Sequence, residues 1–74
     1  MSRLPALSSS RLLKIIQKIG FVKEHQRGSH VFLRHVDGRT TTVPFHKGED
    51  IGRGLLRKIL RDIQVEPEDF IKFL

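Results

Sequence analysis

Cysteine is absent from this 74-residue sequence, and long apolar runs are absent too. The absence of cysteine excludes a disulfide-stapled fold and any thiolate metal site. The apolar runs are only a few residues long, so no segment can cross a membrane as a helix, and the N-terminus lacks the apolar core of a signal peptide. We therefore expect a soluble, cytoplasmic protein without a membrane partner.

The short chain allows one domain at most. A domain of this size buries only about 60–65% of the surface that its unfolded chain exposes. Two thin layers of secondary structure cannot enclose a deep catalytic pocket. Any chemistry should therefore take place on an open surface, which suits a polymeric substrate better than a small metabolite.

Basic side chains are in clear excess, with 14 Lys and Arg against 8 Asp and Glu. The excess lies within residues 1–62, whereas residues 63–74 hold more acidic than basic side chains. A strongly basic body favours a polyanionic partner, and nucleic acid is the commonest one. A basic protein with no such partner is the plain alternative.

Helical spacing and capping residues predict three helices. Residues 1–7 are expected to form a flexible, unstructured arm that precedes a single domain over 8–74. Three serines at 8–10 offer N-caps for a helix that ends near Ile19. A second helix is expected over 54–63, and a short last helix begins at Pro67.

Three strands are expected between the first two helices, over 21–26, 30–35 and 39–45. The turns between them carry Gly28-Ser29 and Asp37-Gly38, and the second pair is a strong hairpin signal. Hairpin-linked strands form an antiparallel sheet, and two amphipathic helices can cover one of its faces. The predicted fold is therefore a two-layer α+β domain whose other sheet face stays open.

Strand alternation places His30, Phe32 and Arg34 on one face of the second strand and Val31 and Leu33 on the other. If the latter two face the helices, the histidine lies on the open face. Phe32 leaves the reverse assignment open, because its ring would also fit a core. An exposed imidazole can exchange a proton near neutral pH and could deprotonate a ribose 2′-hydroxyl. A surface histidine on a basic strand is the plain alternative.

Cations near this strand and on both helices are candidate phosphate contacts, although any solvated helix also shows a charged outer face. The candidates are Arg27, Arg34, Lys14, Lys18, Arg57 and Arg61. The four histidines have no cysteine beside them and no metal-ligand spacing, and no glycine-rich phosphate loop is present. We expect neither a metal nor a small-molecule cofactor.

The order of motifs resembles that of the HicA toxin family, over about residues 8–74. The matching segments are Ile19-Gly20-Phe21, Arg27-Gly28-Ser29-His30 with Phe32, Asp37-Gly38-Arg39, Val43-Pro44-Phe45-His46 and Gly54-Leu55-Leu56-Arg57-Lys58-Ile59-Leu60. The resemblance implies an α-β-β-β-α fold similar to a double-stranded RNA-binding domain. It also implies a toxin of a type II toxin–antitoxin pair that cleaves messenger RNA and is inhibited by a HicB-type antitoxin.

The family's catalytic histidine, which follows Gly-Ser on the second strand, maps onto His30. Gly28 and Ser29 would then fix the turn that lets the imidazole project, and a backbone N–H there would contact phosphate. His46 also matches a family position, either as a second catalytic group or as part of the strand end. The hypothesis is a metal-independent endoribonuclease. A non-catalytic RNA-binding module of the same fold and a basic protein-interaction domain are the alternatives.

Overall fold

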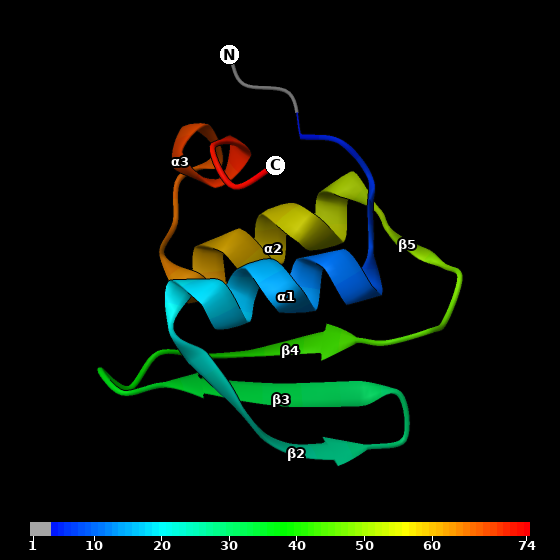
Figure 1. Cartoon of the computed structure of the whole chain (residues 1–74), viewed down its shortest axis with the longest axis vertical. Coiled ribbons are helices and arrows are strands. Elements are labelled where there is room, and N and C mark those ends of the chain that lie inside the picture. Colours follow the sequence, from blue (N-terminus) through cyan, green and yellow to red (C-terminus); the bar gives the residue numbers. More distant parts are fainter. Residues whose placement is uncertain (1–3) are drawn as a thin grey trace.

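Three antiparallel strands form one layer, and helices cover one of its faces (Figure 1). The computed structural model describes residues 4–74. The elements in chain order are β1 (Leu7–Ser8), α1 (Ser9–Ile19), β2 (Phe21–Arg27), β3 (His30–His35), β4 (Thr40–Pro44), β5 (Asp50–Ile51), α2 (Arg53–Ile63) and α3 (Pro67–Ile71). The predicted α+β class and the α-β-β-β-α order are confirmed. No helix of the described chain is long and apolar enough to span a membrane.

Local capping explains where α1 begins and ends. The Ser8 hydroxyl accepts a hydrogen bond of 3.2 Å from the backbone N–H of Arg11, which satisfies one of the free donors of the first turn. Gly20 ends the helix with φ of 124°, a region that favours glycine. A Cβ at this position would lie 2.8 Å from Nε2 of His35, so a larger residue would also displace that ring.

Glycines at positive φ close both hairpins of the sheet. Arg27 pairs with His30, which leaves Gly28 and Ser29 as a two-residue loop with φ of 58° at the glycine. Positive φ at the first loop position is what a type II′ turn requires. The second hairpin closes at Gly38, where φ is 100°. Both turns occur where the sequence predicts them.

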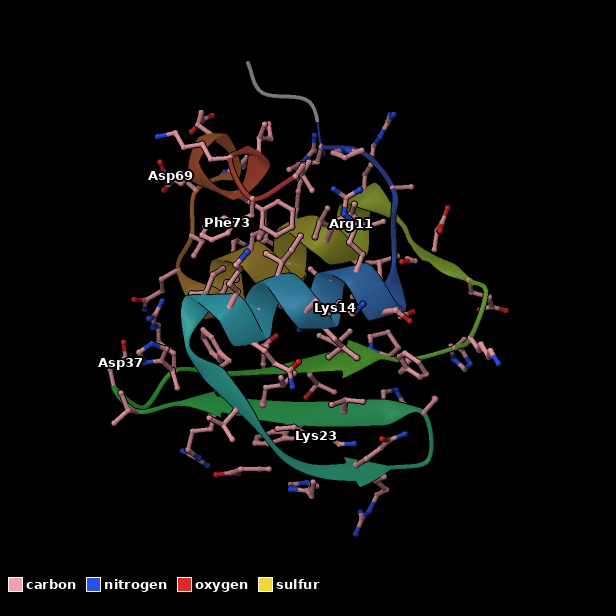
Figure 2. The ribbon with its side chains drawn as sticks, viewed as in Figure 1. Arg11, Lys14, Lys23, Asp37, Asp69 and Phe73 are labelled. Carbon is pink, nitrogen blue, oxygen red and sulfur yellow. The ribbon has the colours of Figure 1, made fainter. Side chains whose placement is uncertain are left out.

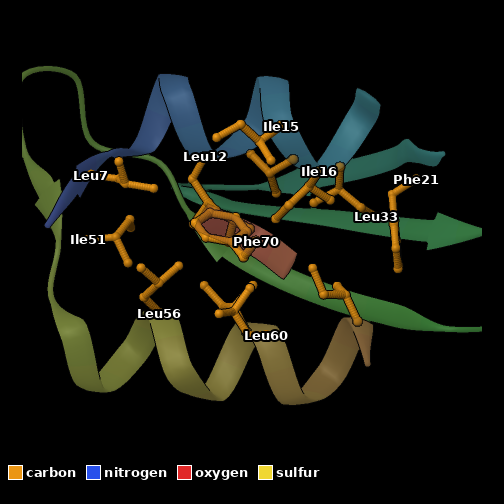
Figure 3. Close-up of a cluster of buried hydrophobic side chains, with 14 of the residues drawn as sticks. Leu7, Leu12, Ile15, Ile16, Phe21, Leu33, Ile51, Leu56, Leu60 and Phe70 are labelled. Atoms are coloured by element: carbon orange, nitrogen blue, oxygen red, sulfur yellow. The ribbon is translucent and has the colours of Figure 1, made fainter. Parts of the chain in front are cut away.

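The core lies between the sheet and the two long helices (Figure 3). β3 is the central strand in the order β2-β3-β4, and it contributes Val31 and Leu33 to the core. The ring of Phe70 from α3 inserts between the two helices, close to Leu12 and Leu60 in the view of Figure 3. The short last helix is therefore part of the packing.

The N-terminal segment differs from the expectation of an unstructured arm. Leu4 and Leu7 are buried in the core, and β1 pairs with β5 in an antiparallel register that joins Leu7 to Ile51. Figure 3 shows these two side chains facing each other beside Leu56. Burial of apolar surface thus fixes residues 4–7, while residues 1–3 of the predicted arm lie outside the described residues.

A cluster of side chains fastens the β3–β4 turn to the end of α2. Arg39 lies over the ring of Phe21, with its guanidinium carbon 5.2 Å from the ring centroid, and donates a hydrogen bond to the carbonyl of Ile63. The backbone N–H of Arg39 and then its guanidinium hold the pKa of the Asp37 carboxyl below its ordinary value. Ionised Asp37 therefore stabilises the turn above its ordinary pKa, and this contribution is lost as pH falls through the lower, folded-state value.

We predict that Leu7→Ala lowers the free energy of unfolding by about 2–5 kcal/mol, because it removes a buried side chain from a small core. Urea denaturation of the full chain measures the loss. Val36→Ala is the control, since Val36 is 96% exposed and should change stability by less than about 0.5 kcal/mol. An equally small effect for Leu7→Ala would show that the N-terminal segment does not contribute to the core.

Candidate active site

β3 presents His30 to solvent because its alternate residues are anchored beneath the helices. Val31 is 2% exposed and Leu33 is fully buried, whereas His30 and Arg34 are exposed. Phe32 lies on the same face as these two and is half-buried. The face assignment that the sequence left open is thereby settled, with the imidazole on the uncovered side of the sheet.

Cross-strand pairing arranges the open face in three rows, since directly paired residues share a face. The rows are Arg27–His30–Pro44, then His25–Phe32–Thr42, then Val22–Arg34–Thr40. The first row lies beside the β2–β3 turn. His30 thus stands on the central strand, with a cation on one side and a proline on the other.

A β-bulge in β2 decides which of its side chains reach this face. The register shifts between Lys23 and His25, so Glu24 has no direct partner on β3. Phe21 and Lys23 therefore lie on the helix side, while His25 and Arg27 lie on the open side. Without the extra residue all four would share one face, and either Phe21 would leave the core or His25 would leave the open face.

The imidazole of His30 is available for chemistry. Neither it nor the guanidinium of Arg27 forms a side-chain hydrogen bond or ion pair with another residue of the part that the structure describes. The adjacent turn is tied to the end of β4 by the N–H of Phe45, which donates to the carbonyl of Ser29 at 2.6 Å. His46 follows at once and is exposed, so it lies at the same end of the sheet as His30.

Arg34 is less available than Arg27. Its Nε lies 2.6 Å from a carboxylate oxygen of Glu24, the bulge residue. An exposed ion pair of this kind is weak in water, and a phosphate can compete for the guanidinium. The pair still offsets the positive charge of Arg34 at this end of the open face.

The predicted helical cations are not brought together with His30. Lys14 and Lys18 are exposed on α1, opposite its buried side chains, and Arg57 and Arg61 are exposed on α2. Figure 2 shows Lys14 beside α1, above the strands in this view. The two arginines line a groove of about 430 Å³ between α2 and α3. All four belong to the helical layer, so the predicted RNA-binding residues form two separate surfaces.

The other two histidines have neighbours that sequence reasoning missed. His35 packs edge-on against Phe21, with ring centroids 5.1 Å apart, and its Nδ1 accepts a 3.1 Å hydrogen bond from the N–H of Asp37. His25 stacks on Phe32 with an interplanar angle of 11°. Counting residue pairs back from the Gly28-Ser29 turn would have found this second contact.

Comparison with known families settles the relationship of the chain. The sequence model of the family described as HicA toxin of bacterial toxin-antitoxin matches residues 9–65. The chain belongs to the HicA toxin family. No curated protein sequence matches it significantly. Members of the HicA family are toxins of toxin–antitoxin systems, so an antitoxin partner is implied for this one, and the family is known for cleaving RNA.

The family match covers the three strands that build the open face, β2 to β4, and also the two long helices α1 and α2. It ends before α3, although α3 supplies the buried ring of Phe70. Within residues 4–74, no group of three or more His, Asp or Glu side chains is arranged to hold a metal ion.

We predict that Gly28→Ala destabilises this HicA chain by roughly 1–2 kcal/mol, because an L-residue is strained at φ of 58°. Gly54→Ala is a matched control: Gly54 is helical in α2, and apart from its chain neighbours and the backbone of its own helix no described atom lies within 4 Å of the position that its Cβ would take. The control should leave stability unchanged or raise it by up to about 1 kcal/mol. Equal effects of the two substitutions in urea denaturation would contradict the turn geometry.

Proposed function

We propose that this HicA toxin is an endoribonuclease that cuts messenger RNA, with His30 as its general acid or base. The observation that carries the proposal is the exposed imidazole on the central strand, which pairs with no other side chain of residues 4–74 and belongs to a residue that lies across from Arg27 in the register. The Gly-Ser-His segment of the family match supports the same residue. An open sheet face also suits a chain-like substrate better than a small molecule.

The proposed reaction uses the nucleophile that RNA itself provides. A base removes the proton of a ribose 2′-hydroxyl, and the 2′-oxygen attacks the adjacent phosphorus. The bond from phosphorus to the 5′-oxygen breaks, and that oxygen takes up a proton. The products are a 2′,3′-cyclic phosphate and a 5′-hydroxyl end. His30 transfers one of these two protons, and the step requires no metal ion.

The two cationic surfaces take different parts of the RNA in this proposal. Arg27 and the backbone at Gly28-Ser29 contact the phosphate at the cleaved bond, where they offset its charge. Arg34, two rows away on the same face, contacts a neighbouring phosphate. The cations of α1 and α2 (Lys14, Lys18, Arg57 and Arg61) contact phosphates farther along the same chain. His46 is the candidate for the second proton transfer because it lies at the same end of the sheet.

Inhibition by a HicB-type antitoxin fits the same geometry. Among residues 4–74 the helices cover one face of the sheet and leave the other open, so a protein partner can bury the open face without unfolding the toxin. A partner that covers His30 and Arg27 would block access of the phosphate and pair with an exposed cation. We propose this face as the antitoxin contact.

We predict that His30→Ala lowers the rate of RNA cleavage by about 10²–10⁴-fold, the usual contribution of one positioned acid or base. Single-turnover cleavage of a labelled RNA, with chelator present, measures the loss. The fold should persist, because the side chain is exposed and lacks side-chain partners within residues 4–74. Undiminished cleavage by His30→Ala removes this residue from the mechanism, and bound but uncut RNA with the wild type favours a non-catalytic binding module.

We predict that Arg27→Gln and Arg57→Gln have different effects, because each removes a cation from a different one of the two surfaces. Arg27→Gln should lower cleavage of short and long RNA alike and reduce the salt slope of binding by roughly 0.7, the value for one phosphate contact on a single strand. Arg57→Gln should weaken binding only of RNA long enough to reach α2. Salt titrations with oligomers of increasing length measure both effects. A loss with the shortest oligomer for Arg57→Gln would contradict this division.

A further inference from the structure

Two aromatic rings stack on the open face in the row next to His30. The ring centroids of His25 and Phe32 are 4.9 Å apart, and the planes are nearly parallel at 11°. Phe32 comes from the central strand and His25 from β2, which is an edge strand. The exposed imidazole therefore ends the stack, and in the described part of the chain no further strand pairs with β2 beyond it.

The stack lies close to the proposed point of cleavage. Phe32 follows His30 by two residues on the same strand, which advances about 6.8 Å along the sheet. His25 precedes Arg27 by two residues on the neighbouring strand. The two rows are thus adjacent on one face, so a nucleotide whose phosphate contacts Arg27 and His30 has its base within reach of the rings.

We propose that His25 and Phe32 form a stacking platform for one unpaired nucleobase of the RNA. The proposal rests on the proposed ribonuclease function and adds a substrate class to it, namely single-stranded RNA. Base-on-ring stacking tolerates any base, because every base has a flat π-face. In a duplex each base already stacks between its neighbours, so RNA-binding proteins stack aromatic side chains on bases that are unpaired.

Charge complementarity supports RNA as the occupant of this face. Arg27 and Arg34 flank the platform in the two adjoining rows, and each carries a positive charge. The acidic side chain beside them, Glu24, is already paired with Arg34. Single-stranded RNA has negatively charged phosphates for the arginines and unstacked bases for the rings. A duplex would supply the phosphates but no free base.

A purely structural role for the pair makes a different prediction. Cross-strand aromatic pairs stabilise hairpins, so His25→Ala would then lower stability and leave RNA binding unchanged in the folded protein. A stacking platform makes binding depend on the presence of a base at one nucleotide. The decisive comparison is therefore between a normal RNA and one that lacks that base.

The test uses the full chain with His30→Ala as background, so that RNA is bound without being cut. Binding of a single-stranded oligoribonucleotide is compared with that of oligomers of the same sequence that each carry one abasic nucleotide at a different position. The abasic oligomer that binds the background protein most weakly identifies the stacked base. His25→Ala should weaken binding of the intact oligomer by roughly 5- to 150-fold, the range for losing one stacked base. It should leave binding of the abasic oligomer nearly unchanged.

Further variants keep the test interpretable. His25→Phe preserves a flat ring and should restore binding, and Val22→Ala, on the same face but in the third row, should have no effect. A 2-aminopurine base at the stacked position should lose fluorescence on binding, and less so with His25→Ala. Phe32→Leu gives the same result if the half-buried position tolerates it, and His25→Ala decides alone if it does not.

Two results would overturn the platform. One is that the His25→Ala protein binds both oligomers as tightly as the background protein does; the other is that its affinity for both oligomers falls by the same factor. These outcomes are distinct from failure of the nuclease. Wild-type cleavage with no dependence on the base removes the platform and leaves the nuclease. Base-dependent binding by a protein that never cuts RNA removes the nuclease and leaves the platform.

Discussion

Burial of Val31 and Leu33 beneath the helices is the constraint on which the site depends. Side chains alternate along a strand, so anchoring these two residues forces His30, Phe32 and Arg34 to the opposite face. A slip of one residue in the pairing of β3 would reverse every side chain and bury the imidazole. The burial of apolar side chains that stabilises the small core therefore also orients the proposed catalytic side chain toward the open face.

Much of the fold follows from local signals in the sequence. The capping serine before α1, the glycines of both hairpins and Pro67 at the start of α3 act within a few residues, and each occurs where expected. The pairing of β1 with β5 was missed because each strand has two residues and no readable periodicity. Leu7 meets Ile51 only when the whole chain folds, so its burial has no local signature.

The position of His30 in the candidate site was predictable from the sequence, but the placement of the residues around it was less so. Alternation and the Gly-Ser-His resemblance pointed to His30, but the bulge at Glu24 has no sequence signal. That bulge lets Phe21 enter the core while His25 reaches the open face, which simple alternation forbids. The helical cations were grouped with the strand cations because sequence gives charge without placement. In the structure the helical cations lie in the helical layer, whereas Arg27 and Arg34 lie on the opposite, open face of the sheet.

Two layers leave little room for an enclosed pocket, so the catalysis that we propose would depend on positioning groups on a surface. The central strand is well suited to this, because β2 and β4 pair with it on both sides and hold its backbone. A flat surface also gives water free access to the phosphate, which weakens electrostatic stabilisation. A base that covers the rings beside His30 would displace part of this water. Stacking would then raise the rate as well as the affinity, and an abasic substrate would lose both.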